Sequence, residues 1–203
     1  MTSLSPLLID ASVLPMVELL ALCLDGHLYR VGDAFATAAT PDCPDLRAHA
    51  FALSAPDWAV ADRGTAAWIH GTRATPPPLP QVCVPPRRRG RVSSPLIDAC
   101  HRALRPDEVT SLGRTTVTTP LRTAEDLIST PSAFGSAQAL EVRHLLALAG
   151  VTPPEFDDRL RASRRMGRAL ARTRVPAVAR AALPGPILDE QADRPPDASV
   201  SLR

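Results

Sequence analysis

Three short strand-forming runs between Trp58 and Leu127 are each followed at once by a helix or strand-end signal, and this succession constrains the fold most. The first run, Trp58 to Ala61, stops at Asp62, whose side chain is expected to cap a helix over about residues 64–69. Gly71 supplies the residue that ends that helix in the left-handed conformation. The segment predicts a strand followed by a helix.

Two more runs extend this pattern. Gln81 to Val84 predicts a strand that ends at two prolines, which cannot donate hydrogen bonds to a sheet. Thr115 to Thr118 predicts a β-branched strand, and Thr119-Pro120 then reads as the N-cap and first position of a helix reaching Ile128. The order strand, helix, strand, strand, helix indicates a mixed α/β unit.

Flanking patterns complete an α+β fold. Met16 to Leu24 predicts a helix, and a two-stranded wing turned at Gly32-Asp33 follows it, as in a small winged helix-turn-helix. Further elements are expected as helices over 44–53 and 136–148, strands over 96–100 and 109–112, and a helix from Pro153. We expect a winged-helix-like region over 1–40 that is degenerate, a mixed α/β domain over 44–150, basic C-terminal helices over 151–183 and a disordered tail over 184–203.

Three motifs carry a family resemblance: ADRGTAAWIHG, VCVPPRRRGRV and RALRPDEVTSLGRTTVTTPLRTAEDLI. Together they are similar to the AbiEi-type antitoxins of type IV toxin–antitoxin systems, over roughly residues 45–150. The positions that match are Asp62, Arg63, Thr65, His70, Gly71, Pro120, Arg122, Thr123, Asp126 and Leu127.

The resemblance implies a regulatory protein. Its winged helix would bind promoter DNA, and its α/β domain would counteract a nucleotidyltransferase-type toxin. Some relatives continue into a nuclease-like domain that would begin where this sequence ends, so we expect no nuclease activity to be carried over. The alternative is an orphan or truncated nucleic-acid-binding module related to those nuclease-linked proteins and without catalytic activity.

Charge is distributed unevenly along the chain, which complicates DNA binding by the N-terminal region. Residues 1–60 carry two Arg against seven acidic residues, whereas residues 61–203 carry 21 Arg against 14. Phosphate neutralisation dominates affinity for DNA. We therefore assign nucleic-acid binding mainly to Arg87, Arg88, Arg89 and Arg91, with Arg30 as the N-terminal candidate; a solvated loop is the alternative for the Arg87–Arg91 cluster.

A second basic segment runs from Arg159 to Arg180, with eight Arg and no acidic residue. It could lie on nucleic acid or an acidic partner, or pack on the domain with its Arg stems directed outward. Pro176 is expected to kink or divide it. Its candidate apolar contacts are Leu160, Met166, Leu170 and Val178.

Catalytic and metal-binding patterns are missing from the sequence. The four cysteines lack the paired spacing of a zinc ribbon, so free reduced thiols and no metal or other cofactor are expected. His70 is expected to cap the carbonyls at the end of its own helix, and Arg122 to pair with Asp126 four residues on. We predict a cytoplasmic protein that is not an enzyme, whose candidate partners are DNA and a toxin, without a membrane.

Overall fold

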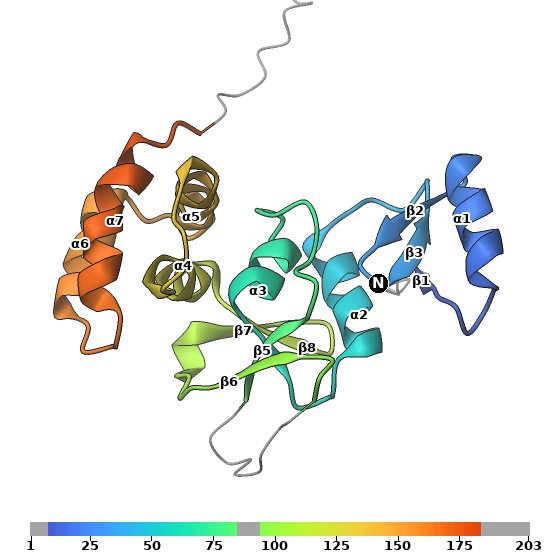
Figure 1. Cartoon of the computed structure of the whole chain (residues 1–203), viewed down its shortest axis with the longest axis horizontal. Coiled ribbons are helices and arrows are strands. Elements are labelled where there is room, and N and C mark those ends of the chain that lie inside the picture. Colours follow the sequence, from blue (N-terminus) through green and yellow to red (C-terminus); the bar gives the residue numbers. More distant parts are fainter. Residues whose placement is uncertain (1–7, 85–93, 184–203) are drawn as a thin grey trace, which may run out of the picture.

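The computed structural model describes residues 8–84 and 94–183. Within them the helices and strands are arranged in three parts along the long axis of the molecule (Figure 1). A small sheet with one helix lies at one end, a mixed sheet occupies the centre, and four helices form the other end. The expected α+β class is confirmed.

The N-terminal part is a three-stranded antiparallel sheet with helix α1 (Met16–Leu24) beside it. Strands β2 (Leu28–Val31) and β3 (Ala34–Thr37) form the expected hairpin, and β1 (Leu8–Ile9) adds a third strand on β3. Its small core consists of Leu19, Leu28 and Phe35. This sheet therefore has one strand more than the two expected from the sequence.

The central sheet is mixed, with the strand order β6-β5-β4-β8-β7. Its strands are β4 (Val60–Ala61), β5 (Gln81–Val84), β6 (Asp98–His101), β7 (Val109–Leu112) and β8 (Thr115–Thr118). Pairs β4–β8 and β5–β6 are parallel, while β4–β5 and β7–β8 are antiparallel. The strand expected over 96–100 thus begins two residues later and ends at His101.

Helices α2 (Pro44–Ser54) and α3 (Arg63–Ile69) share a core with the central sheet. Ala61, Val82 and Val117 occupy neighbouring strands and are fully buried in it. They pack with Leu46 of α2 and Ile69 of α3 in one apolar cluster. Burial of this cluster is the main force that holds both helices on the sheet.

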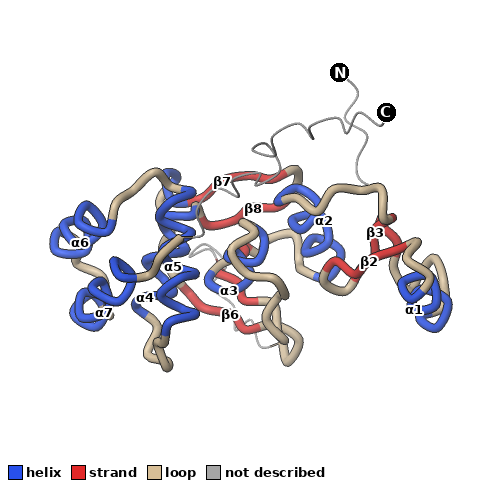
Figure 2. Tube along the Cα trace, turned by 90° about the horizontal axis from the view of Figure 1, so that it is seen from above, coloured by secondary structure: helices blue, strands red, loops and turns tan. Residues whose placement is uncertain are grey.

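The C-terminal part consists of α4 (Pro120–Ser129), α5 (Ser136–Leu148), α6 (Pro153–Ala162) and α7 (Arg168–Arg180), which lie together on the far side of α3 (Figure 2). Ile128, Leu145, Phe156 and Val178 form their core. Ala67 of α3 belongs to the same cluster, so α3 connects the two cores.

The basic segment differs from its prediction in two respects. Pro176 lies inside α7 and does not divide it; the break between α6 and α7 comes at residues 163–167, where Gly167 adopts φ +82°. Leu160 and Val178 are buried as expected, but Met166, which lies in the break, and Leu170 of α7 are exposed. The tail over 184–203 lies outside the described residues. None of the helices in the described part combines the length and hydropathy that a bilayer-spanning segment needs.

Candidate functional site

The two most specific motif segments form neighbouring strand–helix units. Strand β4 leads into α3 and β8 leads into α4, and the two strands are parallel partners, with Val60 opposite Thr116 and Ala61 opposite Val117. Parallel neighbours end at the same edge of the sheet, so the first turns of both helices lie at that edge. Motif residues far apart in the sequence are thereby brought together.

Asp62 is placed at the start of α3, but it does not cap the helix as the sequence predicted. Its side chain accepts from Arg63 Nε at 3.0 Å and from Cys100 Sγ at 2.9 Å. The backbone N–H of Gly64 donates instead to Gln81 Oε1 at 2.8 Å. The prediction was wrong because β5 brings Gln81 to the helix terminus.

The other early motif residues hold the same corner. Thr65 Oγ1 accepts from the backbone N–H of Gln81 at 2.7 Å. Arg63 has φ +44°, the one positive value among the described non-glycine residues, and its guanidinium donates to Asp98 as well as Asp62. Burial raises the pKa of Asp62, and the neighbouring Arg63 opposes this shift.

His70 also differs from its prediction. It does not cap its own helix; its Nε2 lies 2.7 Å from the carbonyl oxygen of Thr118, at the end of β8. A carbonyl only accepts, so Nε2 carries the proton. Burial lowers the pKa of His70. Gly71 adopts φ +83° after α3, as expected.

The second motif begins α4 as predicted. Pro120 is the first helical residue, and the Thr119 side chain accepts from the backbone N–H of Arg122 at 3.4 Å. Thr123 Oγ1 lies 2.8 Å from Thr118 Oγ1, which ties the helix to its strand. Leu127 packs, partly buried, against the C-terminal core.

Arg122 is the centre of a buried charge network. Its Nε donates to Asp126 at 2.9 Å, which confirms the expected pair, and its Nη1 donates to Glu108 at 3.0 Å. Glu108 belongs to the 3₁₀ turn η1 (Pro106–Glu108), and Asp126 receives a second guanidinium from Arg102 at 2.5 Å. All three members of the central triad, Glu108, Arg122 and Asp126, are buried.

The later C-terminal helices join this network through Glu108 of the central part and Glu125 of α4. Glu125 is paired with Arg159 of α6 and with Arg165 in the α6–α7 connection, and Arg165 also reaches Glu108. We define the clamp as Arg102, Glu108, Arg122, Glu125, Asp126, Arg159 and Arg165. Charges on five separate segments thus fix the C-terminal helices to the α/β unit.

A cavity of about 610 Å³ opens beside the clamp. Its walls include Arg63, Arg102, Arg122, Arg165 and Arg168. Its carboxylates, Glu125 and Asp126, each pair with two guanidinium groups. Both carboxylates of the cavity wall are thus engaged in ion pairs, and guanidinium groups make up most of its charged lining.

Most of the basic segment has partners within the chain. Arg161 and Arg172 pair with Asp157 of α6, and Arg174 donates to the carbonyls of Ile128 and Thr130. These contacts favour the prediction that the segment packs on the domain. Arg164 and Arg180 form no ion pair with the described residues.

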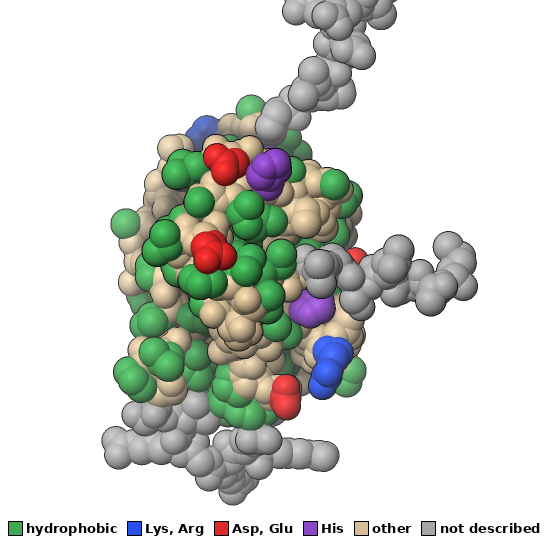
Figure 3. Space-filling view, turned by 90° about the vertical axis from the view of Figure 1, so that its right-hand side faces the viewer, with side chains coloured by type: hydrophobic (Ala, Val, Ile, Leu, Met, Phe, Trp, Pro, Cys, Tyr) green, Lys and Arg blue, Asp and Glu red, His purple; other side chains and the backbone are tan. Residues whose placement is uncertain are grey.

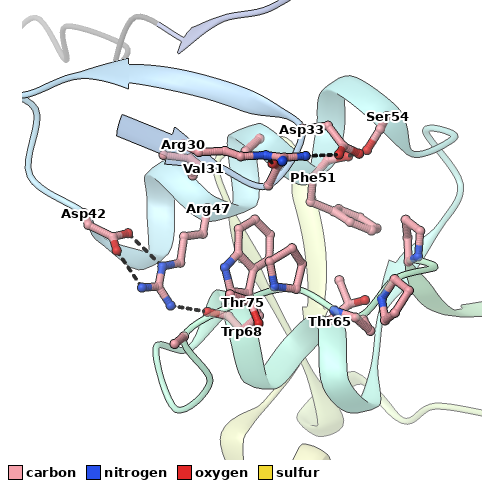
Figure 4. A pocket seen from close by; sticks show the side chains of 17 residues that line it. Arg30, Val31, Asp33, Asp42, Arg47, Phe51, Ser54, Thr65, Trp68 and Thr75 are labelled. Atoms are coloured by element: carbon pink, nitrogen blue, oxygen red, sulfur yellow. Dashed lines mark hydrogen bonds and ion pairs between the residues drawn. The ribbon is translucent and has the colours of Figure 1, made fainter. Parts of the chain in front are cut away.

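Arg30 lines a second cavity, of about 410 Å³, between the β2–β3 hairpin, α2, α3 and the proline-rich segment 74–80 (Figure 4). Its Nε donates to the carbonyl of Gly32 at 2.7 Å, and its Nη2 lies 3.5 Å from Asp33. Arg47 makes two hydrogen bonds to Asp42 and one to the carbonyl of Trp68, which fastens α2 to α3. Arg87, Arg88, Arg89 and Arg91 lie outside the described residues, so their predicted role stays a prediction.

Helix α1 presents an unusual surface for a terminal helix. Of its apolar side chains only Leu19 is buried, while Met16, Val17, Leu20 and Leu24 are exposed, and Val13 before the helix is exposed as well. Apolar side chains are spread over this end of the molecule, with few basic ones among them (Figure 3). Large exposed apolar patches are typical of surfaces that contact another molecule.

The sequence did not reveal Glu108, Arg102 and Arg165 as partners of Arg122 and its neighbours, nor the meeting of Cys83 and Cys100. Spacing within one helix revealed the Arg122–Asp126 pair, but the other contacts join separate segments. No sequence signal for them was available. The chain matches no protein-family model, and no curated protein matches it.

Proposed function

We propose that this chain is a non-catalytic, antitoxin-like regulatory protein that binds a nucleotidyltransferase-type toxin through the exposed face of α1. The apolar surface of that helix carries the proposal. Val17 is 79% exposed and Leu24 is 89% exposed. A helix that only covered its own sheet would not require apolar side chains at such exposed positions. Burial of such side chains in a partner's groove is a common basis of helix recognition.

Charge favours a protein over DNA as the partner of this end. The two Arg residues of the acidic half, Arg30 and Arg47, are paired with Asp33 and Asp42. Glu18 lies on α1 itself, where it would repel phosphate. A partner surface that is apolar with a basic border complements this face.

The clamp supports a non-catalytic role. It engages Arg122 and Asp126, two of the family-like polar positions, in buried ion pairs that attach the C-terminal helices. These buried ion pairs make the α/β unit rigid, which suits a protein that binds a partner. Nucleic-acid contact, as part of autoregulation, is assigned to the basic region downstream of residue 60.

The proposal predicts a nucleotidyltransferase reading frame beside the gene for this chain, and the test is co-expression of that nucleotidyltransferase with the chain. We expect the intact chain to restore growth that the toxin alone arrests, and to co-purify with it. The double variant Val17→Asp, Leu20→Asp should lose both effects while keeping its far-ultraviolet circular dichroism spectrum.

The matched control is Leu53→Asp on α2. Leu53 is 49% exposed and Leu20 is 47% exposed, so the two substitutions change similar surface at different places. The control should restore growth like the parent. Failure of the intact chain to restore growth, or full activity of the double variant, would contradict the proposal.

A further inference from the structure

Two cysteines and one aspartate from three segments converge beside the clamp. Cys83 of β5 and Cys100 of β6 are register partners on adjacent parallel strands. The carboxylate of Asp62 reaches the same place from the end of β4, and one ligand atom from each of the three residues lies within 4.8 Å of the other two. Residues opposite each other in a sheet direct their side chains to the same face, which explains why the two thiols meet.

From this geometry we propose that Asp62, Cys83 and Cys100 form a binding site for a thiophilic divalent cation of the zinc type. Zinc is held in proteins by cysteine thiolates, with bonds of about 2.3 Å, and by carboxylate oxygens at about 2.0–2.2 Å. Tetrahedral coordination with such bonds separates two sulfur ligands by about 3.8 Å, so closing the observed cluster on an ion needs only small side-chain movements.

The Asp62 carboxylate is positioned as a ligand by its neighbours. Arg63 Nε donates a hydrogen bond to Oδ1, while Oδ2 lies 2.9 Å from Cys100 Sγ. A hydrogen bond to the second oxygen of a metal-binding carboxylate is the usual support for a ligand. Asp62 is also released from capping α3, because Gln81 provides that hydrogen bond.

The local charges balance an ion of this kind. Binding would release the proton of each thiol, so two thiolates and a carboxylate would face a divalent cation and leave one net negative charge. Arg63 touches Asp62, and the backbone carbonyl of Arg102 is 3.4 Å from Cys83 Sγ, which puts two Arg residues beside the site. Cys100 is only partly buried, which gives an ion access from solvent.

Three protein ligands leave a fourth position for water or another small donor. The cation would join β4, β5 and β6 at one edge of the sheet. Because metal binding adds its free energy to the folded state, an occupied site would also stabilise the central sheet.

Cobalt(II) is the probe, because its thiolate complexes absorb light where the protein does not. Full-length reduced protein, free of chelator, should bind one equivalent of Co²⁺ with thiolate-to-metal charge-transfer bands, and Zn²⁺ should displace it. Cys83→Ser and Cys100→Ser should each weaken binding by at least about 100-fold, beyond the 10- to 100-fold typical of a lost supporting hydrogen bond. The variants Cys23→Ser and Cys43→Ser remove the other two cysteines and should bind like the parent.

A second measurement on the unsubstituted protein guards against variants that fail to fold. Zinc should protect Cys100, the partly exposed thiol of the pair, from alkylation, as mapped by peptide mass spectrometry, and leave Cys23 and Cys43 reactive. Asp62→Asn should weaken cobalt binding by about 10-fold or more, while Asp98→Asn, which removes the other carboxylate at Arg63, should not. Absence of charge-transfer bands, or zinc protection of Cys23 and Cys43 in place of the proposed pair, would overturn the site.

Discussion

The guanidinium of Arg122 donates to the carboxylate of Glu108 at 3.0 Å, and both side chains are almost completely buried. Arg122 lies in the first turn of α4, whereas Glu108 ends the turn before β7. The same Arg pairs with Asp126, so one cation serves two buried carboxylates. Removing it takes one positive charge from the buried cluster and leaves Asp126 only its pair with Arg102, and Glu108 only its pairs with Arg105 and Arg165.

We therefore expect Arg122→Leu to lower the free energy of unfolding by about 3–5 kcal/mol. The exposed pairs of Arg161 provide the control, and Arg161→Ala should change stability by less than about 1 kcal/mol. Urea denaturation followed by circular dichroism measures both. Equal effects of the two substitutions would show that the clamp does not stabilise the fold.

Stability should depend on pH through His70. Burial lowers the pKa of its imidazole from the ordinary value of 6.5, so the unfolded chain binds the proton more readily than the folded one. This contribution to stability is fully present above pH 6.5 and is lost as pH falls from there towards the lower pKa of the folded state. His70→Gln, which keeps a donor for the Thr118 carbonyl, should flatten the pH dependence in that window.

The exposed His49 provides the control substitution for His70→Gln. Unfolding free energies of the parent, His70→Gln and His49→Gln at pH 7.5 and 5.5 give the result. His49→Gln should behave like the parent. If His70→Gln loses as much stability on acidification as the parent does, another group is responsible.

Truncation of two adjacent leucines on α1 should change stability by very different amounts. Leu19 is fully buried against Leu28 and Phe35, so Leu19→Ala should destabilise the N-terminal part by about 2–5 kcal/mol. Leu20 faces outward, and Leu20→Ala should cost less than about 1 kcal/mol. Hydrogen exchange of the β2 and β3 amides reports on this part of the molecule directly. Similar exchange in both variants would mean that α1 packs differently from the arrangement described.

The Gly167 backbone is held closely against the end of α4. A Cβ there would lie 2.9 Å from the carbonyl oxygen of Ser129, in a residue with φ +82°. Gly150 has φ +65° but nothing within 4 Å of such a Cβ. Both Ala variants should bear the left-handed cost of about 1–2 kcal/mol, and Gly167→Ala a further 1–3 kcal/mol, roughly, for the clash. Thermal unfolding of the two variants tests the difference, and equal melting temperatures would contradict it.

Nucleic-acid affinity, where it is measured, should depend on the downstream Arg residues. Replacing Arg87, Arg88, Arg89 and Arg91 by Ala should weaken binding similarly on all sequences and reduce the slope of log affinity against log salt by about 0.9 for each lost phosphate contact. Arg30→Ala should reduce it by at most about one unit. Fluorescence anisotropy over a salt series decides. If Arg30→Ala abolishes sequence-specific binding and the quadruple variant binds like the parent, the N-terminal part is the one that recognises DNA.

The sequence by itself determined the features that depend on neighbours in the chain. Thr119-Pro120 begins α4, Gly71 follows α3 with positive φ, and Arg122 pairs with Asp126, because capping, backbone freedom and helical spacing act over a few residues. The same local rules gave the α+β class.

Only the tertiary structure decided which segments meet. Pairing of β4 with β5 brings Gln81 to the start of α3 and frees Asp62 from the cap that its position had suggested. Register between β5 and β6 places Cys83 opposite Cys100, although their spacing in the chain has no metal-binding pattern. Strand register follows from burying one face of the whole sheet, a property of all its strands together that no short stretch of sequence contains.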